Sequence, residues 1–287
     1  MRPGYTRVFL LLVICQAVAG VRGSAQGIPP AGSGNDNRKL QILDLNQIVR
    51  QVMSTESDKY DYSADIFNDN SASVHLHVLG YAQTTPLHLH HKSEEATFVV
   101  AGKPHVTQIF GSKGKAEKLE GDYTPGTMIY SPKLCGHKWV NTAKNVMQAN
   151  LVISTPPFVG NFYVDQTEPL FRKSDPGLIV RLNDDLQRWM RDSQNPFLAE
   201  KLPMMNGWML RLLLRKQVHL KPSSSPTMLY LVSGKGLLGA GQSYSISAQN
   251  VALIPPNYDI TLDAGQNSPI AAIIFRPGTG WEALPTQ

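Results

Sequence analysis

The stretch that decides the fold is GYAQTTPLHLHHKSEEATFVVAG, residues 80–102. It contains two histidines separated by one residue, His88 and His90, and a carboxylate five residues later, Glu95. Residues i and i+2 of a β-strand face the same side of the sheet, so both imidazoles point at one spot. After a bend, Glu95 returns a carboxylate to that spot. The pattern predicts a metal site built on β-strands, with His91 or Glu94 as alternative ligands if the register shifts.

A second stretch supplies a further ligand. Residues 126–141, GTMIYSPKLCGHKWVN, carry His137 on a later strand, after a turn that contains Pro132. Three neutral imidazoles and one carboxylate suit a divalent first-row metal. The sequence therefore predicts one divalent metal, with iron expected for an oxygenase and manganese, copper, nickel or zinc also compatible. Its predicted ligands are His88, His90, Glu95 and His137.

The two stretches resemble the paired motifs of the cupin family. Residues 80–102 match the first motif, and residues 126–141 match the second, except that Gly136 directly precedes the histidine instead of lying three residues before it. The resemblance implies a double-stranded β-helix, which is a small jelly-roll barrel with the metal inside. The implied barrel covers roughly residues 70–155.

The C-terminal part of the chain resembles a degenerate second cupin. When Gly234 is aligned with Gly102, Thr227 takes the position of the carboxylate ligand. Leu220 and Pro222 take the positions of the two histidines. This half is expected to bind no metal and to pack against the first barrel. The predicted fold is all-β, with two jelly-roll cupin barrels per chain and a helical connector between them.

The first 25 residues have the pattern of an export signal. Arg2 and Arg7 precede an apolar run, Val8 to Ala19, which is shorter than the roughly 20 residues needed to span a bilayer. An uncleaved N-terminal anchor is the alternative. We expect a secreted or periplasmic protein with no stable membrane insertion after cleavage. Cleavage removes Cys15 and leaves Cys135 alone, so no internal disulfide is expected.

Composition and hydrophobic periodicity divide the chain into segments. The predicted segments are a signal peptide at 1–25, a leader and N-terminal arm at 26–69, a metal-binding barrel at 70–155, a connector with a helix at 156–205 and a degenerate barrel at 206–287. Within the arm, Leu40 to Met53 predicts either a short helix or a strand followed by a helix. Within the connector, a helix is expected over Leu182 to Leu202, with a break at Asn195-Pro196.

Net charge argues against a nucleic-acid partner. The chain is 42% hydrophobic and 17% charged, which provides apolar cores and excludes a wholly disordered protein. The formal charge is +5, but the first 25 residues hold three arginines and no acidic residue. Without them, 24 basic and 22 acidic residues remain, a balance of +2. Such a weak and dispersed charge does not favour binding to nucleic acid.

Several side chains near the ligands are candidates for a substrate pocket. The predicted pocket residues are Tyr81, Gln83, His105, Tyr130 and Trp139. A further pair, His75 and His77, lies on an earlier strand, opposite an apolar face that runs through residues 74–78. This pair either enters the pocket or lies on a solvated face of the sheet. The solvated face is favoured, because the apolar face is expected to point at the core of the barrel.

Resemblance to cupins implies a fold and a metal site but no particular reaction. There is no arginine between Arg50 and Arg172, so the barrel lacks a bidentate clamp for carboxylates. The sequence favours an exported mononuclear metal-dependent enzyme, of oxygenase type or of lyase or isomerase type, acting on a small neutral or phenolic substrate. Glu95 is either a fixed ligand or a base. The alternative is a non-catalytic exported protein that stores metal or binds a small ligand, and a homo-oligomer is compatible with both.

Overall fold

β-Strands dominate the computed structural model of this chain, and two short helices accompany them. The structure describes residues 39–55, 61–112, 115–144, 146–158, 160–165, 173–204, 207–265, 268–278 and 285. The predicted signal peptide and the leader up to residue 38 lie outside the described residues. Neither helix of the described part has the length and apolarity that crossing a membrane requires.

The first barrel consists of two facing antiparallel sheets. One has six strands in the order β12–β8–β5–β10–β3–β2, and the other has five in the order β11–β4–β9–β6–β7. The six strands are, in that order, Leu178–Arg181, Thr127–Ser131, Glu94–Ala101, Gln148–Thr155, Ser73–Leu79 and Asp61–Asn68. The five strands are Phe162–Tyr163, Thr84–Leu89, Gly136–Asn141, Pro104–Ser112 and Lys115–Asp122.

The second barrel repeats this plan with a six-stranded and a four-stranded sheet. Their orders are β1–β19–β16–β21–β14–β13 and β15–β20–β17–β18. The six strands are Gln41–Asp44, Asn250–Ile254, Thr227–Ser233, Ile270–Pro277, Gly207–Leu214 and Phe197–Leu202. The four strands are Gln217–Leu220, Ile260–Ala264, Lys235–Ala240 and Gln242–Ser247. Strand β1, which comes from the N-terminal arm, therefore completes the C-terminal barrel.

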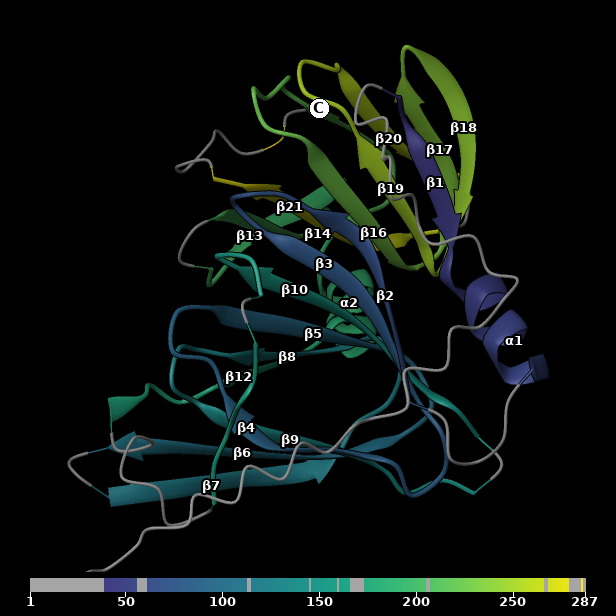
Figure 1. The fold of residues 1–287 in the computed structure, drawn as a ribbon. Helices are drawn as coiled ribbons and strands as arrows, with labels where there is room; N and C mark the ends of the chain where they lie inside the picture. The colour runs from purple at the N-terminus through teal and green to yellow at the C-terminus, as the bar shows by residue number, and fades with distance from the viewer. Residues whose placement is uncertain are drawn as a thin grey trace, which may run out of the picture.

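The two six-stranded sheets pack face to face at the centre of the molecule (Figure 1). Their facing side chains form one hydrophobic cluster that joins both barrels. Phe98 of β5 and Tyr230 of β16 meet in it, with ring centroids 5.6 Å apart. Val74, Leu76 and Val78 of β3 belong to the same cluster. The apolar face of β3 is thus buried against the second barrel and not inside its own.

This packing corrects the interpretation of His75 and His77 that the sequence favoured. Side chains alternate between the two faces of a strand. Because the apolar face of β3 contacts the other barrel, its polar face points into the first barrel. His75 and His77 line the interior cavity there and do not lie on a solvated outer face.

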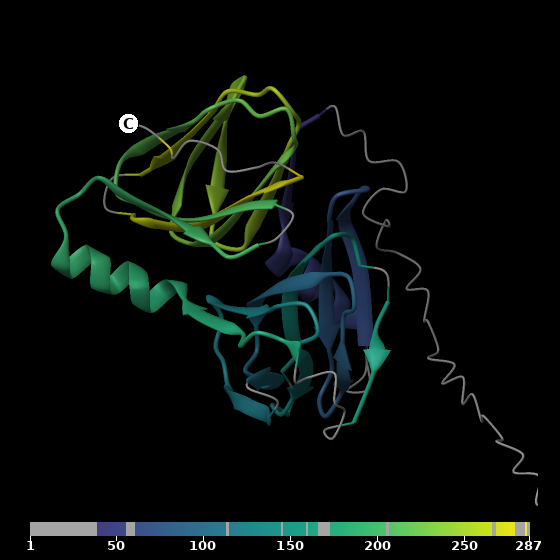
Figure 2. The same ribbon diagram turned by 90° about the vertical axis from the view of Figure 1, so that its left-hand side faces the viewer.

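The arm and the connector contain the two helices. Strand β1 leads directly into α1, Leu45–Thr55, which is the strand-then-helix alternative for the arm. Helix α2, Leu182–Asp192, buries Leu182, Leu186 and Trp189 and lies beside the junction of the barrels (Figure 2).

The expected helix over Leu182 to Leu202 is wrong in its second half. Residues Phe197–Leu202 form β13, which pairs with β14 along its whole length. Proline disfavours the helical conformation for the residue that precedes it, so Asn195 lies in the break between the helix and the strand. Without β13, the edge of β14 would present unpaired backbone N–H and C=O groups. A strand at this position pairs with them, whereas a longer helix would not.

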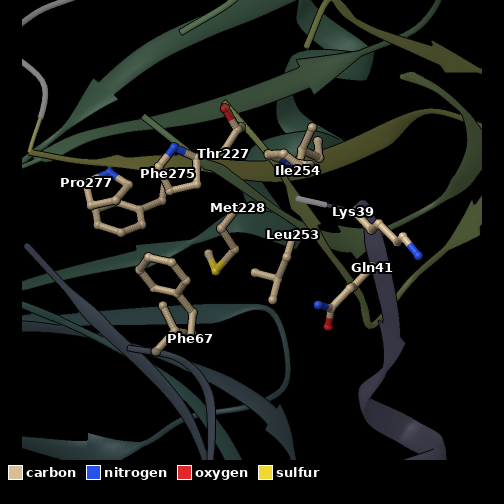
Figure 3. Close-up of a pocket in the computed structure, with 12 residues that line it drawn as sticks. Lys39, Gln41, Phe67, Thr227, Met228, Leu253, Ile254, Phe275 and Pro277 are labelled. Atoms are coloured by element: carbon tan, nitrogen blue, oxygen red, sulfur yellow. The ribbon is translucent and has the colours of Figure 1, made fainter. Parts of the chain in front are cut away.

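A small pocket remains where the barrels meet, near β2 and β16 (Figure 3). Phe67, Met228 and Phe275 are among the side chains that line it. Its volume is about 30 Å³, enough for a water molecule or two but not for a substrate. It is a packing gap between the barrels.

Candidate metal centre

Strands β4 and β9 bring three histidines together inside the first barrel. His88 is the penultimate residue of β4 and pairs across the sheet with His137 of β9, and His90 follows two residues later. The ring centroids of His88 and His137 are 4.2 Å apart, and each lies 5.2 or 5.1 Å from that of His90. All three side chains are buried, and one ligand atom from each lies within 4.8 Å of the others. The three predicted histidine ligands thus meet at one point.

Backbone carbonyls orient the three rings. Nδ1 of each histidine is hydrogen-bonded to a backbone carbonyl oxygen. The distances are 2.7 Å from His88 to Pro86, 3.3 Å from His90 to Gly160 and 3.1 Å from His137 to Cys135. A carbonyl oxygen only accepts, so Nδ1 carries the proton and Nε2 keeps its lone pair. Nε2 of His90 and of His137 is buried and makes no hydrogen bond to any residue that the structure describes. Three free Nε2 atoms facing one point fit a metal ion.

Glu95, on β5, lies beside the three histidines. Its carboxylate oxygens lie 3.2 Å from Nε2 of His90 and 3.6 Å from Nε2 of His137. The hydroxyl of Thr97 donates to Oε1 of Glu95 at 2.8 Å, which holds the carboxylate toward the rings.

Protonation states in this cluster favour metal binding. Burial acts to raise the pKa of Glu95, but the close contact with Nε2 of His90 and the nearby histidine charges outweigh it and hold the pKa well below its usual range. Burial, together with the charge of His137, lowers the pKa of His88 to about 3. Burial lowers the pKa of His137 as well, whereas the Glu95 carboxylate raises that of His90 against the effect of burial. An ionised carboxylate and three imidazoles, each offering Nε2 once any second proton has left, form a donor set suited to a divalent first-row metal.

The cluster opens into a cavity of about 510 Å³ inside the first barrel. His88 and Glu95 contribute to its lining, and polar side chains from β2, β3 and β10 form its opposite wall. Phe158, Tyr163 and Trp139 add aromatic surface. No lysine or arginine is present among the described residues that line it.

Of the five predicted pocket residues, Trp139 lines this cavity and four lie elsewhere. His105 is partly exposed and pairs with Asp122 at 2.9 Å. The hydroxyl of Tyr130 donates to Glu94, and its ring packs in the cluster between the barrels. Tyr81 is 38% exposed, at the turn that precedes β4.

The remaining candidates also lie outside the cavity lining. Gln83 lies in the same turn, where its backbone bonds to Gly80 and Asn141. Of the alternative ligands, Glu94 faces Tyr130, and His91 packs edge-on against Phe162 with centroids 4.5 Å apart. Neither belongs to the group of converging ligand atoms.

Sequence reasoning missed part of the cavity wall. Asp61, Asp65 and Asn150 line the cavity and come from β2 and β10, far from the motifs in sequence. Alternation along β2 and β10 indicates which residues share a face. Alternation does not show which face lines the cavity, because that depends on the second barrel covering the opposite face.

The second barrel has a different interior at the corresponding place. There Arg276 is buried and donates from Nε to the hydroxyl of Thr227 at 2.9 Å and from Nη2 to the carbonyl of Lys221 at 2.7 Å. Its guanidinium lies 5.4 Å from the ring centroid of Trp208. A fixed cation therefore sits against the residue aligned with Glu95. Among the described residues, converging metal-binding groups are found in the first barrel alone.

Comparisons with known proteins agree with this geometry. The family profile described as Cupin matches residues 68–163, a range that contains the whole cluster. No curated protein matches the chain significantly.

Solved structures with two barrels resemble the chain over most of its length. Salicylate 1,2-dioxygenase from Pseudoaminobacter salicylatoxidans has a TM-score of 0.60 and 15% identity, covering 83% of each chain. A cupin 2 conserved barrel domain protein from Leptotrichia buccalis has a TM-score of 0.59 and 10% identity, covering 83% of this chain and 96% of that one. Oxalate decarboxylase from Bacillus subtilis has a TM-score of 0.52 and 14% identity, covering 88% and 81%.

At these identities the likeness concerns the fold, and it confirms the predicted all-β architecture of two barrels. The family match, the histidine cluster and the fold of the solved structures lead to one assignment. Residues 68–163 match the cupin family, the chain as a whole has the fold of solved bicupin structures, and its described metal-site candidate lies in the first barrel.

Proposed function

We propose that this protein is an exported, mononuclear metal-dependent cupin enzyme of oxygenase type that acts on a small neutral or phenolic substrate. The observation that carries the proposal is the convergence of three free Nε2 atoms and an ionised carboxylate on a cavity large enough for a small aromatic molecule. A bound first-row metal would supply Lewis-acid or dioxygen chemistry at that point. His88, His90, Glu95 and His137 are the residues that would hold it.

The cavity lining supports the substrate class. Aromatic rings of Trp139, Phe158 and Tyr163 offer faces for stacking a phenolic ring. The lining has no lysine or arginine among its described residues, so it offers a carboxylate no cationic partner. One similar enzyme, salicylate 1,2-dioxygenase, was solved in complex with gentisate, which is a carboxylate. We propose that this chain differs from that enzyme in the charge of its substrate.

Each of the chain's own residues has a separate task in this proposal. The carbonyls of Pro86, Gly160 and Cys135 keep each ligand ring in its Nε2-free tautomer. Thr97 holds the carboxylate of Glu95 in the site. Phe158, whose ring centroid lies 5.5 Å from that of His90, covers the ligands with apolar surface and limits access of water.

Elemental analysis of protein prepared without added metal is the first test. We expect about one equivalent of iron, manganese or copper per chain, because a site with three imidazoles and a carboxylate retains such metals. Oxygen uptake with catechol and hydroquinone as probes then tests the oxygenase reaction. Retained metal with no uptake for any probe would favour the storage or ligand-binding alternative. A chain that neither contains metal nor takes it up on titration would overturn the proposal.

A further inference from the structure

One wall of the metal cavity is unusually rich in hydrogen-bond acceptors. It is formed by the inner face of β2, β3 and β10, which are neighbours in one sheet. Asp65 pairs with His75, and His77 pairs with Asn150, across these strands. Residues directly opposite each other in an antiparallel sheet project from the same face, with Cβ atoms about 5 Å apart. We call these four residues, together with Asp61, the acceptor wall.

Asn150 provides the observation that points to a ligand. Its side chain is 1% exposed and lines the cavity. Its amide oxygen has no hydrogen-bond partner among the residues that the structure describes. A buried acceptor without a partner loses its hydration and gains nothing in return, so a group that donates to it is expected in the functional state.

The two histidines of the wall have different surroundings. Burial lowers the pKa of His75, and this outweighs the opposing effect of the Glu95 carboxylate. Nε2 of His77 lies 2.9 Å from Oδ1 of Asp61, so this carboxylate already has a partner. Asp65 is exposed at the open edge of the cavity and adds a second carboxylate there. The wall therefore presents acceptors and negative charge on the side away from the metal ligands.

We propose that the acceptor wall is a subsite for a hydrogen-bond-donating group of the substrate, a hydroxyl or a protonated amine, and that it excludes carboxylates. The inference rests on the proposed function, because the rest of the substrate would lie at the metal ligands. In the sheet, His75 is followed by Val152 and then by Thr97, which bonds to Glu95. One substrate of the size of a substituted phenol reaches from the metal ligands to the wall along this row.

A matched set of catechols tests the subsite without relying on turnover. The probes are 4-(2-aminoethyl)catechol, 4-(2-hydroxyethyl)catechol and 3,4-dihydroxyphenylacetate, which share a ring and chain length and differ in the end group. Binding to the iron(III)-loaded protein is read from the catecholate charge-transfer absorbance, titrated under nitrogen. We expect the amine or the hydroxyl probe to bind at least about tenfold more tightly than the carboxylate, as one unfavourable charge contact would produce. If the amine probe binds at least about tenfold more tightly than the hydroxyl probe, the subsite prefers a cation. If the two probes bind equally well, the subsite recognises a neutral hydrogen-bond donor.

Variants connect the preference to the wall. Asn150→Leu keeps the volume but removes the acceptor, and it should reduce the preference over the carboxylate several-fold. Asn150→Asp retains an acceptor oxygen and should preserve or increase the preference. Asp184→Asn removes an exposed carboxylate from α2, outside the cavity, and should leave all three affinities unchanged.

The outcomes separate this inference from the proposed function. Tightest binding of the carboxylate probe, or a preference unchanged in both Asn150→Leu and Asp65→Asn, would overturn the subsite while leaving the metal centre intact. Absence of a charge-transfer band for every probe, in protein that contains iron, would overturn the proposed function itself.

Discussion

Three backbone carbonyls decide the chemistry of the ligand histidines. Each carbonyl accepts from Nδ1 and leaves Nε2 free, so each ring already has the tautomer and orientation that a metal requires. Two of these carbonyls belong to residues two positions before their histidine, Pro86 and Cys135. The local strand geometry therefore prepares the ligands before any metal binds.

Replacing one ligand should remove the metal without unfolding the barrel. In His137→Ala, we expect metal affinity to fall by more than the ~10- to 100-fold typical of losing a supporting residue around a ligand. Metal content by elemental analysis and the β-sheet signal by circular dichroism are the measurements. His105→Ala is the matched control, because that imidazole pairs with Asp122 at the surface. Wild-type metal content in His137→Ala would contradict the site assignment.

The thiol of Cys135 should be unreactive in the folded protein. The residue is 1% exposed, and burial raises the pKa of its thiol to about 12. The thiol stays protonated below that value, so thiolate is negligible between pH 7 and pH 9. In a chain lacking the first 25 residues, labelling by a disulfide reagent should stay slow and should not accelerate across this pH range. One thiol should react after denaturation. Rapid labelling of the folded chain would show that the site is accessible.

At this scale the sequence predicts the ligands but not the wall that faces them. His88, His90 and Glu95 lie within eight residues of one another, so strand geometry alone brings them together. Asn150 reaches the same cavity by pairing with His77, more than seventy residues earlier, and Asp65 reaches it by pairing with His75. No local pattern contains that information.

At the scale of the elements, one turn is repeated in both barrels. Strand β5 is followed directly by Gly102 with φ +80°, and β16 is followed directly by Gly234 with φ +89°. The alignment of these glycines in the sequence is therefore matched by the same backbone conformation. A left-handed conformation favours glycine because other residues meet steric strain there.

Alanine at either turn should destabilise its barrel. A Cβ at Gly102 would lie 2.9 Å from Cα of Gln148, and one at Gly234 would lie 2.3 Å from the carbonyl oxygen of Pro269. Together with the positive φ, we expect a loss of about 1–3 kcal/mol in the free energy of unfolding for each variant. Urea denaturation measures this loss. Gly265→Ala is the control, since its added Cβ would lie 3.8 Å from the nearest atom. Equal stability of Gly102→Ala and Gly265→Ala would refute the turn argument.

The connector shows where element prediction reaches its limit. Apolar periodicity correctly predicts α2, whose buried residues follow helical spacing. The same reasoning extends the helix into Phe197–Leu202, although that segment is a strand. Pairing with the edge of β14 determines its structure, and that edge consists of residues seven to seventeen positions later, which a local sequence pattern does not include.

At the scale of the whole molecule, the contact between the barrels determines which sheet faces line the metal cavity. The sequence predicts two barrels but not which faces meet. Because the two six-stranded sheets bury their apolar faces against each other, the inner faces are free to carry polar residues. In the first barrel that inner face includes the acceptor wall, and in the second it is largely apolar and surrounds Arg276. The interface thus permits one barrel to hold a polar site while both remain folded.

Weakening this interface should destabilise both barrels together. Phe98 is 1% exposed and packs edge-on against Tyr230 across the interface. Phe98→Ala should lower the free energy of unfolding by about 3–5 kcal/mol, because it removes a buried ring and leaves a cavity. Leu237→Ala is the control, since that side chain is 48% exposed and should change stability by no more than about 0.5 kcal/mol.

Hydrogen exchange decides whether the loss is shared. Amides of β6 in the first barrel and of β17 in the second lie on the outer sheets, away from Phe98. If one core stabilises both barrels, Phe98→Ala should increase exchange at both strands by similar free energies. Faster exchange at β6 with unchanged β17 would mean that the barrels unfold independently. In that case, contacts within the first barrel would have to offset the cost of its polar interior, because the core shared with the second barrel would not do so.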